Sequence, residues 1–413
     1  MNKPAAARRD APRAKALAPP RPEVVAFPLA PQPPRRLGPI EGLGLALLVA
    51  LAGKGLIQGG YYAFQYSQDF QWSPAVLLSE GRDAYAWWLA GNADGRILMS
   101  QEPNYLHLLY VLLLPFAALP WPVAKMAWAL CSAGVGVVSG LWLARGAGLR
   151  GWAVMAALAT FVAASPFTHA LGAGQQSLMV LFALTWAWRQ RGRALGGAAF
   201  AVAACKYSFA PPTLVWLLLE RRWRALAAAA LTGLAGLATY AFLCGANPLA
   251  ILTEPLQVSA KATRIGLADV MSFARALQLD AGPVYLAGLA AVGLGVALLW
   301  RRRRELDELT TFALLCQLSL LALFHHLYDY VLLAPLFFRA LSFPPVLRAV
   351  TLVYVGWFWF VVQFIDSLDI MKTPAAISAM ALASAAVFVA AATAGPLQRR
   401  RTLPMPATSA LAL

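Results

Sequence analysis

A chain of 413 residues is ordinarily long enough for two or three soluble domains, but this composition excludes that organisation. Hydrophobic residues make up 60% of the sequence and charged residues only 13%, which is more apolar surface than soluble cores bury. The formal net charge of +16 would suit a nucleic-acid-binding protein, but the basic residues fall in short clusters between apolar runs. That distribution marks the cytoplasmic side of membrane proteins. The sequence therefore predicts an all-α, polytopic helical membrane protein with no nucleic-acid partner.

The two ends of the chain differ from its middle. Residues 1–39 are rich in proline and basic residues and contain no short apolar signal segment, so we expect a disordered basic cytoplasmic tail. Residues 40–394 form a single expected transmembrane domain with outer loops at about 65–103 and 246–282, and residues 395–413 form a second cytoplasmic tail. The four cysteines lie in apolar runs without metal-binding spacing, which indicates packing residues rather than a disulfide.

Polar interruptions suggest how the apolar segments cross the membrane. There are about 11–13 such segments, and several are shorter than the ~20 residues that a perpendicular span needs. Three prolines favour a re-entrant hairpin over residues 104–122, and the break at 205–208 predicts two short helices over 195–219 that meet near the outer face. With these assignments the arginine clusters fall on the cytoplasmic side and the polar loops on the outer side.

Asp69 follows the first apolar span and is the first candidate catalytic residue. A carboxylate at a membrane boundary can be partly desolvated, which raises its pKa and suits it to accept a proton. A solvated loop aspartate is the plainer interpretation. The residues after Asp69 favour an amphipathic segment on the membrane surface, and that segment contains Asp83 and Tyr85.

Three further groups of polar residues interrupt apolar segments. His169 and Gln175 lie in a Gly-rich stretch that could orient sugars or could be an ordinary turn between two spans. Lys206 lies inside an apolar run, where an ionisable side chain usually faces a cavity or a partner. The stretch His325-His326-Leu327-Tyr328-Asp329-Tyr330 could bind sugar or pyrophosphate-like groups, while interfacial packing is the alternative. A metal site is less favoured there, because only one more histidine, His107 or His169, is near enough by topology.

Taken in order, these features resemble glycosyltransferase family 87 of the GT-C superfamily. The resemblance covers roughly residues 66–340, and its motifs are short. They are Asp69-Phe70 with Gly81 and Tyr85; Tyr105 with the Leu-rich and Pro-rich stretch that ends at Pro120; Gly174-Gln175 with Ser177; Lys206; and His326 with Tyr328 and Pro335-Leu336. His107 lies close after Tyr105 where proline is common, and Ser177 stands where asparagine is common, so the sugar or acceptor preference does not follow from the resemblance.

The resemblance implies inverting transfer of a mannose-like hexose from a polyprenyl-phosphate carrier to a glycan or lipid acceptor. It implies a site on the outer face of a bacterial-type plasma membrane, in the cell envelope. Asp69 would be the general base, with Asp83 as the reserve base. Lys206, His326 and either Arg264 or Lys261 would stabilise the leaving phosphate. The remaining residues implied to bind substrate are Tyr85, Tyr105, His169, Gln175 and Tyr328.

Other functions fit parts of the pattern. A lipid or glycan flippase also has broken helices and intramembrane lysines, but no internal repeat of the kind that many transporters show is visible here. An O-antigen ligase or polymerase would need a larger outer loop than 246–282. We expect no cofactor, since the polyprenyl-phosphate sugar is a substrate, and a divalent metal is compatible with the sequence but not supported by it.

Overall fold

The computed structural model describes residues 37–98, 100–261, 268–363 and 373–394, and within these ranges the chain forms helices and no strand. This confirms the all-α, polytopic membrane fold. Most of the predicted tail at 1–39 and the whole tail at 395–413 lie outside the described residues.

Within the described ranges, five helices are long and apolar enough to cross a membrane. Their sequences contain 18-residue windows with few charges, and at ~1.5 Å per residue helices of this length match or exceed the ~30 Å of a bilayer's hydrocarbon core. They are α1 (Pro39–Gln65), α5 (Trp121–Gly146), α11 (Trp223–Cys244), α15 (Ala281–Arg302) and α20 (Pro374–Ala394). A sixth apolar stretch is bent by 54° where α6 (Trp152–Ala163) meets α7 (Ser165–Ala173), at Ala164, whose backbone is extended.

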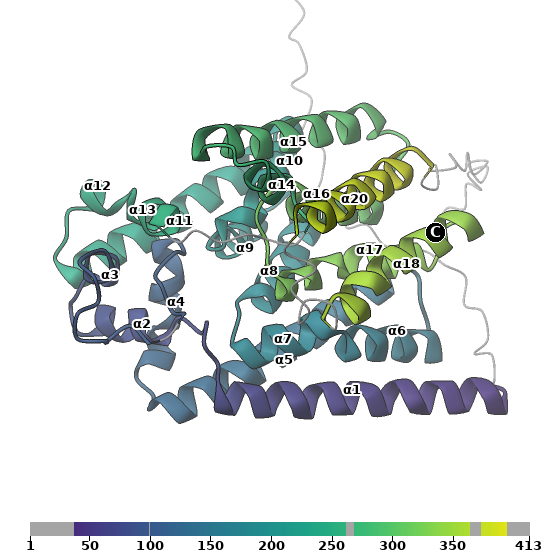
Figure 1. Cartoon of the computed structure of the whole chain (residues 1–413), viewed down its shortest axis with the longest axis horizontal. Helices are drawn as coiled ribbons and strands as arrows, with labels where there is room; N and C mark the ends of the chain where they lie inside the picture. The colour runs from purple at the N-terminus through teal and green to yellow at the C-terminus, as the bar shows by residue number, and fades with distance from the viewer. Residues whose placement is uncertain (1–36, 99, 262–267, 364–372, 395–413) are drawn as a thin grey trace, which may run out of the picture. The chain divides into compact units, whose positions relative to one another are not determined.

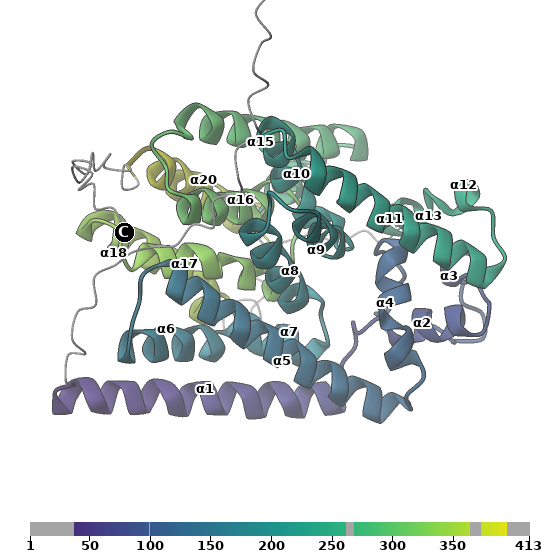
Figure 2. The same ribbon diagram turned by 180° about the vertical axis from the view of Figure 1, so that it is seen from behind.

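The remaining apolar helices are shorter and fill the space between the long ones (Figures 1 and 2). They are α4 (His107–Ala117), α8 (Ser177–Arg189), α9 (Ala194–Ala204), α10 (Ala210–Leu219), α16 (Glu308–Ala322), α17 (Ala334–Ala340) and α18 (Pro345–Gly356), which continues into η3 (Trp357–Val361). The hairpin expected over 104–122 is wrong. This stretch contains one short helix, α4, with Pro115 inside it, and then the start of α5, because Pro120 and Pro122 sit at the beginning of that helix.

The break expected within 195–219 is confirmed. Helix α9 ends at Ala204, a single 3-10 turn, η1 (Tyr207–Phe209), follows, and α10 continues from Ala210. Lys206 lies in this break with non-helical backbone angles. Lys206 thus lies at a point of irregular backbone. Membrane proteins tolerate such backbone where it is buried in protein or lines a cavity.

Both large polar loops contain short helices. The first holds α2 (Trp72–Ser79) and α3 (Ala84–Leu89), and the second holds α12 (Pro248–Ile251), α13 (Glu254–Lys261) and α14 (Val270–Ala276). Figure 1 shows α2, α3, α12 and α13 gathered at the left, and Figure 2 shows the same group from behind. The loops meet where α3 contacts α13 and the Lys261 ammonium donates to the Leu89 carbonyl at 3.4 Å.

One end of the short helices is held by arginine–carboxylate pairs. Arg191 contacts Glu308 at 2.5 Å and Glu220 at 3.6 Å, while Arg339 contacts Asp307 at 2.6 Å. These residues stand at the ends of α8, α10, α16 and α17, and we call this region the arginine-rich end. Positive charge gathers here as the sequence predicts. The opposite ends of the same helices carry Ser177, Lys206, the residues after α16, and η2 (Leu327–Leu333).

Candidate functional site

A buried ion pair joins the helix break to the turn after α16. The Lys206 ammonium lies 2.5 Å from Oδ1 of Asp329, and only 12% and 2% of the two side chains are exposed. Lys206 also donates to Oε1 of Gln175 and to Oγ of Ser177, each at 3.3 Å. A lysine ammonium has three N–H donors, so these three acceptors use its full capacity.

Asp329 fixes the turn that carries the two histidines. Its Oδ1 accepts from Lys206 and from the Ser177 hydroxyl, and its Oδ2 accepts from the His326 backbone N–H at 3.2 Å. The His325 ring nitrogen Nδ1 lies 3.3 Å from the same Oδ2, and the ring stacks on Phe209. A carboxylate with both oxygens engaged in this way holds its surroundings and is poorly placed to accept a further proton.

Gln175 is positioned by a turn that requires glycine. Gly174 ends α7 with φ of +76°, and a Cβ at this position would lie 2.5 Å from Ser67 Oγ and 2.7 Å from Phe70 Cβ. The next residue, Gln175, is buried, and its Oε1 accepts from the Tyr105 hydroxyl at 3.2 Å as well as from Lys206. Gln175 therefore links Tyr105 and Lys206, because its side-chain oxygen accepts a hydrogen bond from each.

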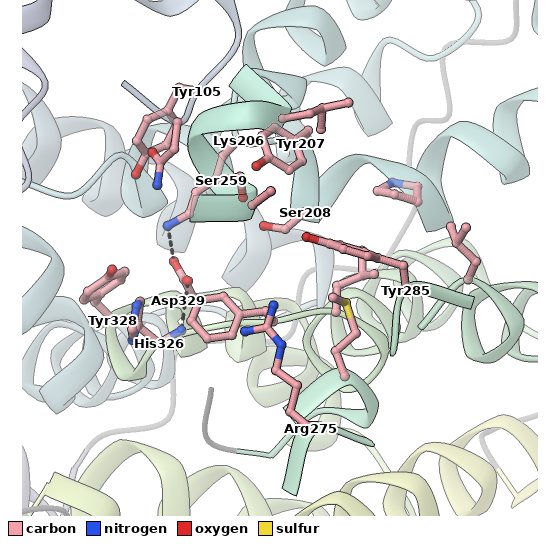
Figure 3. A pocket seen from close by; sticks show the side chains of 18 residues that line it. Tyr105, Lys206, Tyr207, Ser208, Ser259, Arg275, Tyr285, His326, Tyr328 and Asp329 are labelled. Atoms are coloured by element: carbon pink, nitrogen blue, oxygen red, sulfur yellow. Dashed lines mark hydrogen bonds and ion pairs between the residues drawn. The ribbon is translucent and has the colours of Figure 1, made fainter. Parts of the chain in front are cut away.

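A cavity of about 550 Å³ opens beside this network (Figure 3). Its residues come from the irregular segment before α4, the helix break, α10, α13, α14, α15, the turn after α16 and η2, and most of them are apolar or aromatic. They are Asn104, Tyr105, Lys206, Tyr207, Ser208, Pro211, Leu256, Ser259, Ala260, Met271, Arg275, Tyr285, Leu289, Leu323, Phe324, His326, Tyr328 and Asp329. We call it the Lys206 cavity.

Two helix lengths give the distance between this network and the arginine-rich end. Helix α8 runs 13 residues from Ser177 to Arg189, about 20 Å at 1.5 Å per residue. Helix α16 runs 15 residues from Glu308 to Ala322, about 22 Å. Both distances from the arginine-rich end are shorter than the ~30 Å of a bilayer's hydrocarbon core.

Asp69 adjoins this network through the backbone. Its N–H donates to the Ala173 carbonyl at 2.9 Å, and its carbonyl accepts from the Gln176 side chain at 3.4 Å. Phe70 is fully buried and stacks on Trp128, whose indole donates to the Gly174 carbonyl. The Asp69-Phe70 and Gly174-Gln175 motifs are thus in direct contact, although the half-buried Asp69 side chain is not among the residues that line the cavity.

Asp83 and Tyr85 anchor the first loop rather than line the cavity. Asp83 caps α3, and its Oδ1 also accepts from the Tyr240 hydroxyl at 3.1 Å. Tyr85 is fully buried, and its hydroxyl donates to the Tyr105 carbonyl at 2.5 Å. Rings of Tyr85, Tyr240 and His107 pack together. Tyr85 therefore positions Tyr105 and has no open surface for a sugar.

Glu254 at the start of α13 lies against Asp83. Partial burial and the Asp83 carboxylate beside it raise the pKa of Glu254 to about 7. A hydrogen bond from the protonated Glu254 carboxyl to the Asp83 carboxylate also favours the raised pKa, because the proton removes the repulsion between two negative charges. This contact links the two outer loops a second time.

Other predicted residues lie elsewhere. His169 is exposed on α7 and does not line the cavity, and Lys261 on α13 contacts the first loop instead. Arg264 lies outside the described residues. His326 and Tyr328 do line the cavity, with ring centroids 5.3 Å apart, and the Tyr328 ring lies 4.9 Å from the Lys206 ammonium.

Sequence reasoning missed two residues and the role of a third. Asp329 was part of the predicted stretch 325–330, but its pairing with Lys206 was not predicted, although a buried lysine needs a counter-ion. Arg275 and Glu254 lie in the second loop without a motif, and only the fold brings them to the cavity and to Asp83. Within the described ranges, no group of three or more His, Cys, Asp or Glu side chains has metal-binding geometry.

Comparison with known proteins gives one match. The model of glycosyltransferase family 87 matches residues 108–324, which is more than half of the chain and includes α4, the helix break, the second outer loop and α16. No curated protein and no solved structure matches significantly.

Proposed function

Because the chain belongs to glycosyltransferase family 87 and is a membrane glycosyltransferase, we propose that it transfers a mannose-like hexose from a polyprenyl-phosphate carrier to a glycan or lipid acceptor, with inversion at the anomeric carbon. The observation that carries this proposal is the Lys206 cavity. It combines an apolar lining, a buried ion pair and ring side chains at a depth where a lipid-linked donor would present its head.

The charge of the cavity supports a phosphodiester donor. Among the described residues that line it, Lys206 and Arg275 are cationic and Asp329 is anionic, so one positive charge is in excess. A polyprenyl-phosphate sugar carries one negative charge at its phosphodiester. A single excess cation balances that charge, whereas a pyrophosphate-linked donor would bring more negative charge than these residues compensate.

The chemistry assigns Asp69 as general base. The acceptor hydroxyl attacks the anomeric carbon, its proton passes to the Asp69 carboxylate, and the bond from that carbon to the phosphate oxygen breaks with its electron pair leaving on the phosphate. Contact between the Asp69 backbone and the turn before Gln175 supports this role, because it holds residue 69 beside the network that borders the cavity. His326 and Tyr328 are placed to orient the donor sugar.

The orientation in the membrane follows from charge. The arginine-rich end would face the cytoplasm together with both termini, and the two polar loops would face the outside of a bacterial-type plasma membrane. In this arrangement the donor enters sideways from the bilayer and the acceptor arrives from the side of the loops. The family membership favours this transferase over the alternative of a lipid or glycan flippase.

Transfer of radiolabel from polyprenyl-phosphate mannose tests the proposal in membranes that contain the protein. Wild type should form a labelled product, and Asp69→Asn should lose nearly all of it because the neutral amide cannot accept the proton. Asp94→Asn in the same loop is a matched control and should keep wild-type activity, since Asp94 contacts Trp87 and Arg96 and not the cavity.

Two outcomes would contradict the proposal. Full transfer activity in Asp69→Asn, together with loss of activity in Asp83→Asn, would show that Asp83 and not Asp69 is the general base. No transfer by wild type from any polyprenyl-phosphate sugar would reject the donor class.

A further inference from the structure

We propose that Arg275 binds the donor's phosphate and that Lys206, despite its intramembrane position, is a positioning residue. The inference rests on the proposed function, since it names the side chain that receives a lipid-linked phosphate. It reverses the expectation from sequence, in which Lys206 held the phosphate.

The hydrogen bonds of Lys206 argue against a direct phosphate contact. Its three N–H donors go to Asp329, Gln175 and Ser177. Its charge is balanced by the Asp329 carboxylate at 2.5 Å. A phosphate could bind Lys206 only by displacing one of these buried partners, which would leave a polar group without its bond. The ion pair therefore ties the helix break to the turn that carries His326.

Arg275 is the other cation among the described residues that line the cavity. Figure 3 shows its side chain extending from α14 into the cavity, on a different side from His326 and Tyr328. A guanidinium has five N–H donors in a planar fork that matches two phosphate oxygens, so it can bind a phosphate beside protein partners. Figure 3 shows the Tyr285 hydroxyl directed toward Ser208 in the same cavity.

The helix that carries Arg275 is firmly fixed. Asp269 caps α14, with its two carboxylate oxygens accepting from the Ser272 N–H at 2.7 Å and the Ser272 hydroxyl at 2.8 Å. Both residues are fully buried, and α14 packs against α15 and α20. Arg275 in the last turn of α14 is thus presented from a rigid element, as a specific ligand contact requires.

Apolar residues that line the same cavity as Arg275 fit the lipid that follows the phosphate. Met271 lies one turn earlier on α14, and Leu289 and Leu256 line the cavity from α15 and α13. A phosphate at Arg275 would have its isoprenoid chain against these side chains and its sugar toward His326 and Tyr328. This order of lipid, phosphate and sugar matches the order of groups in the donor.

Binding of farnesyl phosphate, with farnesol as the uncharged probe, tests the assignment on the purified full chain in micelles. Wild type should prefer farnesyl phosphate, and Arg275→Gln should reduce that preference by about tenfold or more. Arg275→Lys, which keeps the charge but loses the fork, should fall between the two. Arg82→Gln on the exposed first loop is the matched control and should bind like wild type.

Lys206 is tested by the double variant Lys206→Met, Asp329→Asn, which removes both charges and leaves no buried ion unpaired. It should keep the preference for farnesyl phosphate. An unchanged preference in Arg275→Gln, loss of the preference in the double variant, or no preference in wild type would each overturn the proposal. Transfer assays separate this from the proposed function: a wild type that binds farnesyl phosphate through Arg275 but transfers no sugar would reject only the latter.

Discussion

The two ends of the same short helices hold ion pairs in different surroundings. At the arginine-rich end, Arg191 and Glu308 are 15% and 43% exposed, and Arg191 has a second carboxylate partner in Glu220. At the other end, Lys206 and Asp329 are 12% and 2% exposed and share buried neutral partners. The first arrangement tolerates the loss of one partner, because water and neighbours compensate. The Lys206–Asp329 pair, which borders the cavity, should not tolerate such a loss. The comparison distinguishes exposed charges, which orient a protein in the membrane, from a buried pair, which holds the site together.

The largest effect is expected for Lys206→Ala. This change leaves Asp329 charged and buried without its partner, and such losses cost about 3–5 kcal/mol in the free energy of unfolding. Reversible unfolding in mixed micelles measures it. The double variant Lys206→Met, Asp329→Asn should recover most of the loss, and failure to do so would show that packing rather than charge dominates.

A smaller effect is expected for Tyr85→Phe. The variant loses the hydrogen bond from the Tyr85 hydroxyl to the Tyr105 carbonyl, which is worth about 1 kcal/mol. Because Tyr105 contacts Gln175 and lines the cavity, the transfer rate should also fall. Tyr61→Phe on the exposed face of α1 should change neither quantity. Equal transfer rates for Tyr85→Phe and wild type would show that the aromatic cluster of Tyr85, Tyr240 and His107 does not influence the site.

Glu308→Gln tests the arginine-rich end. Its half-exposed carboxylate should contribute at most about 1 kcal/mol, since exposed pairs are screened and Arg191 keeps Glu220. The same unfolding assay applies. A loss as large as that of Lys206→Ala would remove the distinction between the two ends.

The smallest effect is a pH dependence at the outer loops. The pKa of Glu254 in the folded protein is about 7, above its usual 4.5, so the proton stabilises the folded state. That stabilisation is fully present below about pH 4.5 and is lost as the pH rises through 7. Thermal unfolding between pH 5 and 8 should show a falling midpoint in wild type and a flatter profile in Glu254→Gln. A steeper profile in the variant would contradict the carboxyl contact with Asp83.

The sequence predicted the parts of the fold that depend on local pattern. The apolar runs identified the helices, and the polar interruption at Lys206 identified the break between α9 and α10. The hairpin at 104–122 was wrong because prolines mark the start of α5 as readily as the tip of a hairpin.

The site was predictable only in part. Tyr105, Gln175, Lys206, His326 and Tyr328 come together as a group. The pairing of Lys206 with Asp329 across 123 positions, and the approach of Arg275 from the second loop, depend on tertiary packing that no local pattern encodes.

Photocrosslinking tests the central claim, that the Lys206 cavity receives the lipid-linked donor. A polyprenyl phosphate with a photoreactive group in its first isoprene unit would be crosslinked to the protein in membranes, and the labelled peptides identified by mass spectrometry. The account predicts adducts on α13, α14 or α15, at residues such as Leu256, Met271 or Leu289, that unlabelled polyprenyl phosphate suppresses. Adducts confined to the arginine-rich end, or adducts that competition leaves unchanged, would contradict it.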